Sequence, residues 1–237
     1  MNKLGVCITS YNYGKYLGEA IESCLAQSVP VDIVVVNDAS TDDTEDIALS
    51  YDVGYLRLMK NSGNGSIPRN EGIKYLRNEY VCSLDADDKL HKDFALHTIE
   101  ALDKGLGDII SSSYQMFGNE NFFVGVMRNP MLVDFLAKNQ IHSSSVYRRS
   151  MVNEIGEYEP VFGGYNDWEY WLRAVSKGYK FYTVPYMLLF YRKHGKSMVD
   201  TAIDKHQEMF EMIKEKHKDI YSRYSKDIWG RDQTTFM

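Results

Sequence analysis

Residues 31–36 constrain the fold of this chain more than any other segment. Apart from Asp32, every residue in this run is Val or Ile. A run of β-branched residues this dense is typical of a strand that is buried on both faces of a parallel sheet. Such a sheet needs helices on both sides, because parallel strands are joined by crossover connections. We therefore expect an α/β fold.

The first half of the chain alternates between strand and helix patterns, as this fold requires. The predicted strands are residues 4–9, 31–36, 54–59, 80–84 and 108–113. The predicted helices are residues 15–27, 44–50, 66–78 and 91–104. In a sheet of this kind, ligands bind at the carboxyl ends of the strands.

The pattern changes after residue 113. A hairpin is predicted over residues 114–127, around the turn at 118–121. Further helices are predicted at 130–138, 149–155, 167–177 and 201–217, and further strands at 180–184 and 187–192. We divide the chain into a ligand-binding half (1–113), a second half of the same domain (114–200) and a C-terminal helix and tail (201–237).

Composition excludes some classes of function. The net charge of −6 over 237 residues argues against nucleic-acid binding, which needs a basic face. The three cysteines are odd in number and form no Cys-x-x-Cys pair, so we expect buried free thiols in a reducing compartment. No long apolar span and no signal-peptide pattern is evident. We expect a cytoplasmic protein, and leave open a peripheral location at the inner face of the membrane and a homodimer.

Three carboxylates follow the strand at 80–84 within four positions, at Asp85, Asp87 and Asp88. Like charges this close must be hydrated, paired or bound to a cation. Hard cations such as Mg²⁺ or Mn²⁺ take oxygen ligands and keep positions open for phosphates. The cluster therefore predicts a metal site, with a solvated turn that caps the next helix as the alternative.

Polar residues also follow the other strands, and all of them should meet at one edge of the sheet. Tyr11 could stack on a nucleobase, Asp38 could accept from a base N–H, and Arg69 could pair with a phosphate or with Asp85. Alternatively, Asp38 caps a helix, Tyr11 packs in the protein and Arg69 is a solvated helix residue. Together with a metal at the Asp cluster, this set suits a nucleoside diphosphate.

At this point the chain resembles a known family, the family 2 glycosyltransferases, whose domain has the GT-A fold. The resemblance rests on five motifs in order: Thr-Ser-Tyr-Asn at 9–12, Val-Asn-Asp-Ala-Ser-Thr-Asp at 36–42, Asn-Ser-Gly at 61–63, Arg-Asn-Glu-Gly at 69–72 and Leu-Asp-Ala-Asp-Asp at 84–88. Each motif is weak alone, but five in the same order are specific. The resemblance implies a Rossmann-like, mostly parallel sheet flanked by helices, with a C-terminal extension on the acceptor side.

The resemblance also implies roles for individual residues. Asp167, in Gly-Tyr-Asn-Asp-Trp, is similar to the family's catalytic base, although Asn166 stands where the family has Glu. Asp87 and His194 match metal ligands, for Mn²⁺ or Mg²⁺. Asp85 is expected to meet the ribose, or to reach the metal through water. Asp88 is expected to be either a second carboxylate ligand or a helix cap.

Four residues complete the expected site. Thr9 is expected beside the nucleotide, and Ser144, Asn166 and Ser197 on the segments that face the donor and acceptor. The resemblance implies an inverting transfer from a nucleotide diphosphate sugar, with UDP favoured because the pairing of Tyr11 and Asp38 resembles uracil sites. The acceptor is expected to be a glycan or a lipid- or protein-linked sugar.

Three other functions fit the sequence less well. A sugar-1-phosphate nucleotidyltransferase would have a Gly-rich basic loop after the first strand, where this chain has Thr-Ser-Tyr-Asn-Tyr-Gly-Lys. A non-catalytic binding protein would tolerate the loss of Asp167 or of the Asp cluster, and both are present. A phosphorylated receiver domain would not need residues 114–237.

Overall fold

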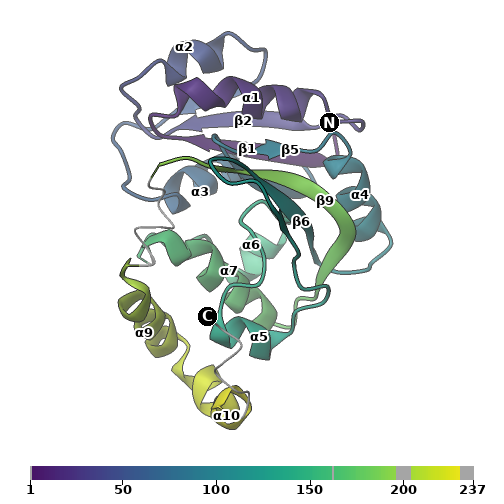
Figure 1. The fold of residues 1–237 in the computed structure, drawn as a ribbon, viewed down its shortest axis with the longest axis vertical. Helices are drawn as coiled ribbons and strands as arrows, with labels where there is room; N and C mark the ends of the chain where they lie inside the picture. The colour runs from purple at the N-terminus through teal and green to yellow at the C-terminus, as the bar shows by residue number, and fades with distance from the viewer. Residues whose placement is uncertain (1, 162, 196–203, 230–237) are drawn as a thin grey trace.

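The computed structural model describes residues 2–161, 163–195 and 204–229, which form one sheet with helices on both faces (Figure 1). The strands are β1 (Leu4–Ser10), β2 (Asp32–Asn37), β3 (Gly54–Arg57), β4 (Tyr80–Asp85), β5 (Lys89–Leu90), β6 (Ile109–Gly118), β7 (Phe123–Val124), β8 (Val146–Arg148) and β9 (Phe181–Lys193). The α-helices are α1 (Gly14–Leu25), α2 (Thr44–Leu49), α3 (Ser66–Tyr75), α4 (Phe94–Asp103), α5 (Leu132–Ala137), α6 (Met151–Ile155), α7 (Asn166–Ser176), α9 (His206–Lys216) and α10 (Lys218–Trp229).

The expected α/β class is confirmed, but only part of the sheet is parallel. Its order is β3-β2-β1-β4-β8-β6-β9-β5, with β7 paired to β6. The strands from β3 to β4 are parallel to one another, whereas β8 runs antiparallel to both of its neighbours. The sequence did not predict β8 or β5, because strands of three and two residues are too short to show an alternating pattern.

Both faces of the sheet are buried, as the β-branched run predicts. Val6, Ile8 and Val35 pack in one cluster with side chains of α1, α2 and α4. Cys7 and Val34, which point to the opposite face, pack in a second cluster with side chains of α3, α5, α6 and α7. The three cysteines are free and buried, as predicted.

The largest difference between the predicted and observed strands lies in β9. Residues 180–192 were expected to form two strands separated by Pro185, but they form one strand that pairs with β6 along its length. The register jumps at this point, because Ser112 pairs with Val184 and Ser113 with Met187. Pro185 therefore lies in a bulge, where its missing N–H interrupts no ladder hydrogen bond.

The second half of the chain extends the same sheet. Strand β6 continues across the predicted boundary at residue 113 and then turns into β7, so the hairpin predicted there is confirmed. The division into three segments stays a prediction. Helix α10 was not predicted, and the expected start of the preceding helix at Thr201 lies outside the described residues. None of the helices in the described part of the chain has the length and apolar character that a membrane span requires.

A buried ion-pair cluster joins the C-terminal helices to α7. Glu169 is completely buried, accepts two hydrogen bonds from Arg173 and forms ion pairs with Lys216 and His217. Burial would raise the pKa of Glu169, but the hydrogen bonds from His217 and Arg173 outweigh it and lower this pKa to about 2. Glu169 thus faces away from the predicted site at Asp167, as its position two residues along the helix requires.

Replacing Glu169 by Gln should lower the free energy of unfolding by about 3 kcal/mol, because it leaves buried cations without their counter-charge. Denaturant melts at neutral pH measure this loss, and Glu215→Gln, an exposed partner of Lys218, is the matched control. The pKa of Glu169 is lower in the folded state. The contribution of Glu169 to the free energy of unfolding is therefore complete above pH 4.5, and it should disappear as the pH falls towards 2. Equal stability of the two variants at neutral pH would contradict this role.

Candidate active site

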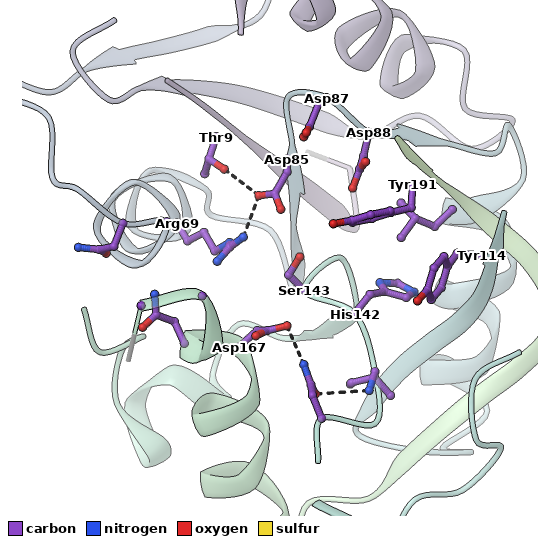
Figure 2. Close-up of a pocket in the computed structure, with 18 of the residues that line it drawn as sticks. Thr9, Arg69, Asp85, Asp87, Asp88, Tyr114, His142, Ser143, Asp167 and Tyr191 are labelled. Atoms are coloured by element: carbon purple, nitrogen blue, oxygen red, sulfur yellow. Dashed lines mark hydrogen bonds and ion pairs between the residues drawn. The ribbon is translucent and has the colours of Figure 1, made fainter. Parts of the chain in front are cut away.

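A cavity of about 1130 Å³ opens at the carboxyl ends of β1 and β4 (Figure 2). One wall carries most of the residues that the sequence singled out for the nucleotide and the metal: Thr9, Tyr11, Asp38, Arg69, Asp85, Asp87 and Asp88. The opposite part includes Asn139, Asn166 and Asp167. The fold thus brings together segments that lie more than a hundred residues apart in the chain.

Asp85 is fixed by two neighbours that the sheet places beside it. Thr9 is its register partner on β1, and the Thr9 hydroxyl donates to Asp85 Oδ1 (3.1 Å). Arg69 Nη2 of α3 donates to the same oxygen (2.8 Å). The expected pairing of Arg69 with Asp85 is therefore present, and Figure 2 shows both side chains at the cavity.

Arg69 is a buried cation between two carboxylates. Only 9% of the residue is exposed. Burial by itself would lower its pKa, but the charges of Asp85 and Asp167 more than compensate and raise the pKa above its ordinary value. Arg69 is therefore always charged, and its guanidinium links the electrostatics of the two sides of the cavity.

Asp87 and His194 form the contact that best fits a metal site. His194 Nε2 lies 2.8 Å from Asp87 Oδ2, and the His194 ring is flanked by the rings of Tyr13 and Tyr16. Burial and the charge of Asp85 raise the pKa of Asp87, while the hydrogen bond from His194 lowers it less. A carboxylate and an imidazole this close can turn to share one cation.

Asp88 has a different environment from Asp87. It is almost fully buried, and its Oδ1 accepts a hydrogen bond from the backbone N–H of Arg192 on β9 (2.8 Å). It does not cap the following helix, because α4 begins at Phe94 with Asp93 at the N-cap. Burial and the charges of Asp87 and Asp85 raise the pKa of Asp88 well above its ordinary value. Its observed contact is therefore with β9.

The donor set fits a metal that the substrate helps to hold. Within the described residues, no three His, Cys, Asp or Glu side chains already converge as a complete metal site. Mg²⁺ and Mn²⁺ are commonly bound by one or two protein ligands, with substrate phosphates and water filling the other positions. Asp87 and His194 would be these ligands, and the cation would neutralise charge on a diphosphate.

The expected nucleobase end of the site is a rigid turn. Asp38 is buried and accepts from Asn61 Nδ2 (3.1 Å) and from the Ser62 backbone N–H (2.9 Å) and hydroxyl (2.7 Å). Burial raises the pKa of Asp38, and the hydrogen bonds from Ser62 lower it by less. Asp38 is not the cap of α2, whose N-cap residue is Asp43, and the preceding Asp42 accepts from the N–H and hydroxyl of Thr44. Contact of Asp38 with a base stays a prediction.

Tyr11 lies at the edge of the same cavity and is 45% exposed. It is therefore not a core residue, and the alternative of a partly buried packing tyrosine stays open. An exposed ring beside the Asp38 turn is available for stacking, and stacking itself stays a prediction.

Asp167 lies across the cavity from Asp85, at the start of α7 (Figure 2). Its Oδ2 accepts from Asn139 Nδ2 (2.8 Å) and its Oδ1 from the Trp168 backbone N–H (2.8 Å). Burial raises the pKa of Asp167, against the lowering effect of Arg69 and of these two hydrogen bonds. The carboxylate is thus held in one orientation and is more basic than an ordinary aspartate.

The predictions for the donor and acceptor segments have mixed outcomes. Asn166 is buried and lines the cavity next to Asp167. Ser144 is only 1% exposed and does not line the cavity, whereas its neighbour Ser143 does. The chain turns at this point, and Ser144 and Ser145 are both buried whereas Ser143 is not. Ser197 lies outside the described residues.

Sequence reasoning missed an uncharged wall formed by Tyr114, His142 and Tyr191. Tyr114 packs edge-on against His142 and tilted against Tyr191, with ring centroids 6.0 and 5.9 Å apart. Burial lowers the pKa of His142 to about 4, so this ring is neutral. Burial and then the charge of Asp88 raise the pKa of Tyr191, which stays protonated. The sequence signals were the high tyrosine content and the similarity of residues 141–145 to the segment that flanks the family's acceptor pocket.

The comparisons with known proteins agree with this arrangement. The model of the family described as "Glycosyl transferase family 2" matches residues 5–161. Poly(ribitol-phosphate) beta-N-acetylglucosaminyltransferase TarP of Staphylococcus aureus (strain N315) is 38% identical over 99 residues, which cover 39% of this chain and 30% of TarP. An uncharacterized glycosyltransferase of Bacillus subtilis (strain 168), YwdF, is 27% identical over 227 residues, 91% of this chain and 84% of YwdF.

A solved structure shows the same fold. The crystal structure of S. aureus TarS in complex with UDP-GlcNAc matches with a TM-score of 0.71 at 22% identity, over 83% of this chain and 60% of that one. In three of the curated relatives, TarP among them, the match covers only about a third of the relative's own length. The expected GT-A fold is thereby confirmed, and the chain belongs to glycosyl transferase family 2.

Proposed function

We propose that this chain transfers a sugar from a nucleotide diphosphate sugar to an acceptor hydroxyl. The observation that carries the proposal is the position of Asp167, across a single cavity from Asp85 and Asp87. His194 contacts Asp87 (2.8 Å). One side of the cavity then suits a diphosphate with a cation, and the other side carries a basic carboxylate. A one-step displacement needs this arrangement, with the base on one side of the reacting carbon and the leaving group on the other.

In this mechanism the Asp167 carboxylate takes the proton of the acceptor hydroxyl. The acceptor oxygen attacks the anomeric carbon as the bond from that carbon to the diphosphate oxygen breaks, and the nucleoside diphosphate leaves with the bonding electrons. Because attack and departure occur on opposite faces, the anomeric configuration is inverted. Asn139 and the Trp168 N–H orient the base, and Arg69 supplies fixed positive charge near the diphosphate.

The nucleotide is proposed to be UDP. Two solved relatives with this fold, both of S. aureus TarS, hold UDP-GlcNAc and UDP. The exposed ring of Tyr11 next to the turn at Asp38 would accept a flat base, and Asp85 would face the ribose. A bound divalent cation, Mn²⁺ or Mg²⁺, would supply charge neutralisation at the diphosphate.

A panel of nucleotides should distinguish UDP from the other candidates. In thermal-shift measurements with Mn²⁺, UDP should raise the melting temperature more than GDP, dTDP or CDP. A ligand at 100 times its dissociation constant stabilises the folded state by about 2.7 kcal/mol. Tyr11→Ala should reduce the shift with UDP, because it removes the ring proposed to stack on the base. The matched control Tyr75→Ala, which removes an exposed ring outside the cavity, should not reduce it. If no nucleotide shifts the melting temperature with either metal, the proposed donor site is wrong.

A further inference from the structure

An exposed apolar surface borders the cavity. Phe122, Phe123, Met127 and Met131 have 48%, 60%, 46% and 62% of their surface exposed. These four side chains, here called the apolar rim, come from the β6–β7 turn (Phe122), from β7 (Phe123) and from the segment that leads to α5 (Met127 and Met131). Exposed apolar residues are common singly, but a group of four on one short stretch marks a binding surface.

The backbone of this stretch is well anchored, so the exposure does not come from a poorly packed segment. The Met116 N–H donates to the Phe122 carbonyl (2.9 Å), and Val124 pairs with Tyr114. On the other side of the turn, Thr183 of β9 donates its hydroxyl to the Met127 carbonyl (2.7 Å). The fold therefore holds the backbone in place while these side chains point outwards.

The apolar rim is continuous with one part of the cavity wall. Val124, Val126 and Val133 line the cavity from the same stretch of chain. Met127 belongs to both, since it lines the cavity and is 46% exposed. An apolar path therefore leads from the outer surface into the site, which a hydrated glycan would not require and a hydrocarbon chain would.

The charge of this stretch also differs from that of the whole chain. Residues 119–140 contain two cations, Arg128 and Lys138, and two anions, Glu120 and Asp134, so their net charge is zero, whereas the chain carries −6. Binding to a bilayer surface scales with buried apolar area plus attraction between charges, and a stretch with no net charge retains the apolar contribution without the repulsion that the acidic remainder of the chain would meet at an anionic surface.

We propose that the apolar rim inserts into the surface of a lipid bilayer and that the cavity receives a lipid-linked acceptor from it. The choice of acceptor rests on the proposed function, whereas the bilayer contact does not. Because the rim is neutral, its insertion depends on apolar burial and not on attraction between charges.

Vesicle flotation tests the contact directly. The wild-type chain should float with phosphatidylcholine vesicles at low and at high salt. The double variant Phe122→Ser with Phe123→Ser should bind at least about tenfold more weakly, because it loses two half-exposed aromatic side chains. The matched control is Leu49→Ser with Leu106→Ser, which removes two leucines that are 61% and 47% exposed elsewhere. This control should bind like the wild type.

Three results would overturn the proposal. The first is a wild-type chain that does not float. The second is flotation only with anionic phosphatidylglycerol vesicles at low salt, which indicates electrostatic adhesion. The third is an equal loss of vesicle binding in both double variants.

The thermal shift with UDP separates the two proposals. A chain whose melting temperature rises with UDP but which does not float contradicts the bilayer contact alone. A chain that floats without any nucleotide shift contradicts the proposed function and its acceptor.

Discussion

Asp167→Asn should lower the rate of sugar transfer by about 10²- to 10⁴-fold, the usual contribution of a general base. The substitution keeps the shape of the side chain and removes only its ability to take the acceptor proton. The carbonyl oxygen of Asn can still accept from the Trp168 N–H, whereas its amide nitrogen cannot accept from Asn139, so one of the two hydrogen bonds is lost while the shape of the side chain is kept. Single-turnover kinetics with a saturating donor measure the effect.

Donor binding should separate this variant from a merely damaged protein. UDP should stabilise Asp167→Asn as much as it stabilises the wild type, since Asp167 faces the acceptor side of the cavity. Asp52→Asn, an exposed aspartate outside the cavity, is the control for the loss of one negative charge. Transfer by Asp167→Asn at the wild-type rate would show that another group is the base.

The pH dependence of transfer gives a second measure of the same role. Burial raises the pKa of Asp167, so its basic form is lost at a higher pH than for an ordinary aspartate. On acidification, transfer by the wild type should therefore fall before exposed aspartates titrate. The residual activity of Asp167→Asn should lack this step.

Asp87→Ala should abolish the part of UDP binding that depends on metal. Asp87 is the carboxylate that faces His194, and removal of a metal ligand should weaken the metal by more than the 10- to 100-fold usual for a residue that only supports a ligand. Calorimetric titration of UDP with Mn²⁺ and with EDTA measures the difference. In the wild type EDTA should weaken binding, and in Asp87→Ala it should have no further effect.

Two variants locate the ligand within the cluster. Asp93→Ala removes an aspartate from the same stretch of chain but outside the cavity, and its metal dependence should equal that of the wild type. His194→Gln should behave like Asp87→Ala, because both donors face the same space. If metal-dependent UDP binding persists in Asp87→Ala, the metal ligand is Asp85 or Asp88 and not Asp87.

Much of the fold could be predicted from the sequence, since it depends on local patterns. The run at 31–36 predicted a strand buried on both faces, and β2 is one. The order of the motifs placed Thr9, Asp38 and Asp85 at one edge of the sheet, and the registers of β1 with β4 and of β1 with β2 confirm it. Prediction failed where a strand is very short, as for β8, or where a bulge carries a strand past a proline, as in β9.

Within the site, the sequence determined which residue types gather at the carboxyl ends of the strands. The resemblance favoured Asp87 for the metal and Asp85 for the ribose, left Asp88 open between ligand and helix cap, and chose Ser144 where Ser143 lines the cavity. Only the tertiary structure gave each carboxylate its own partner. Their partners are distant in the chain: Arg69 for Asp85, His194 for Asp87 and the Arg192 N–H for Asp88. A local pattern fixes where a side chain leaves the backbone, but its burial, charge environment and partner depend on which distant strand the fold places beside it.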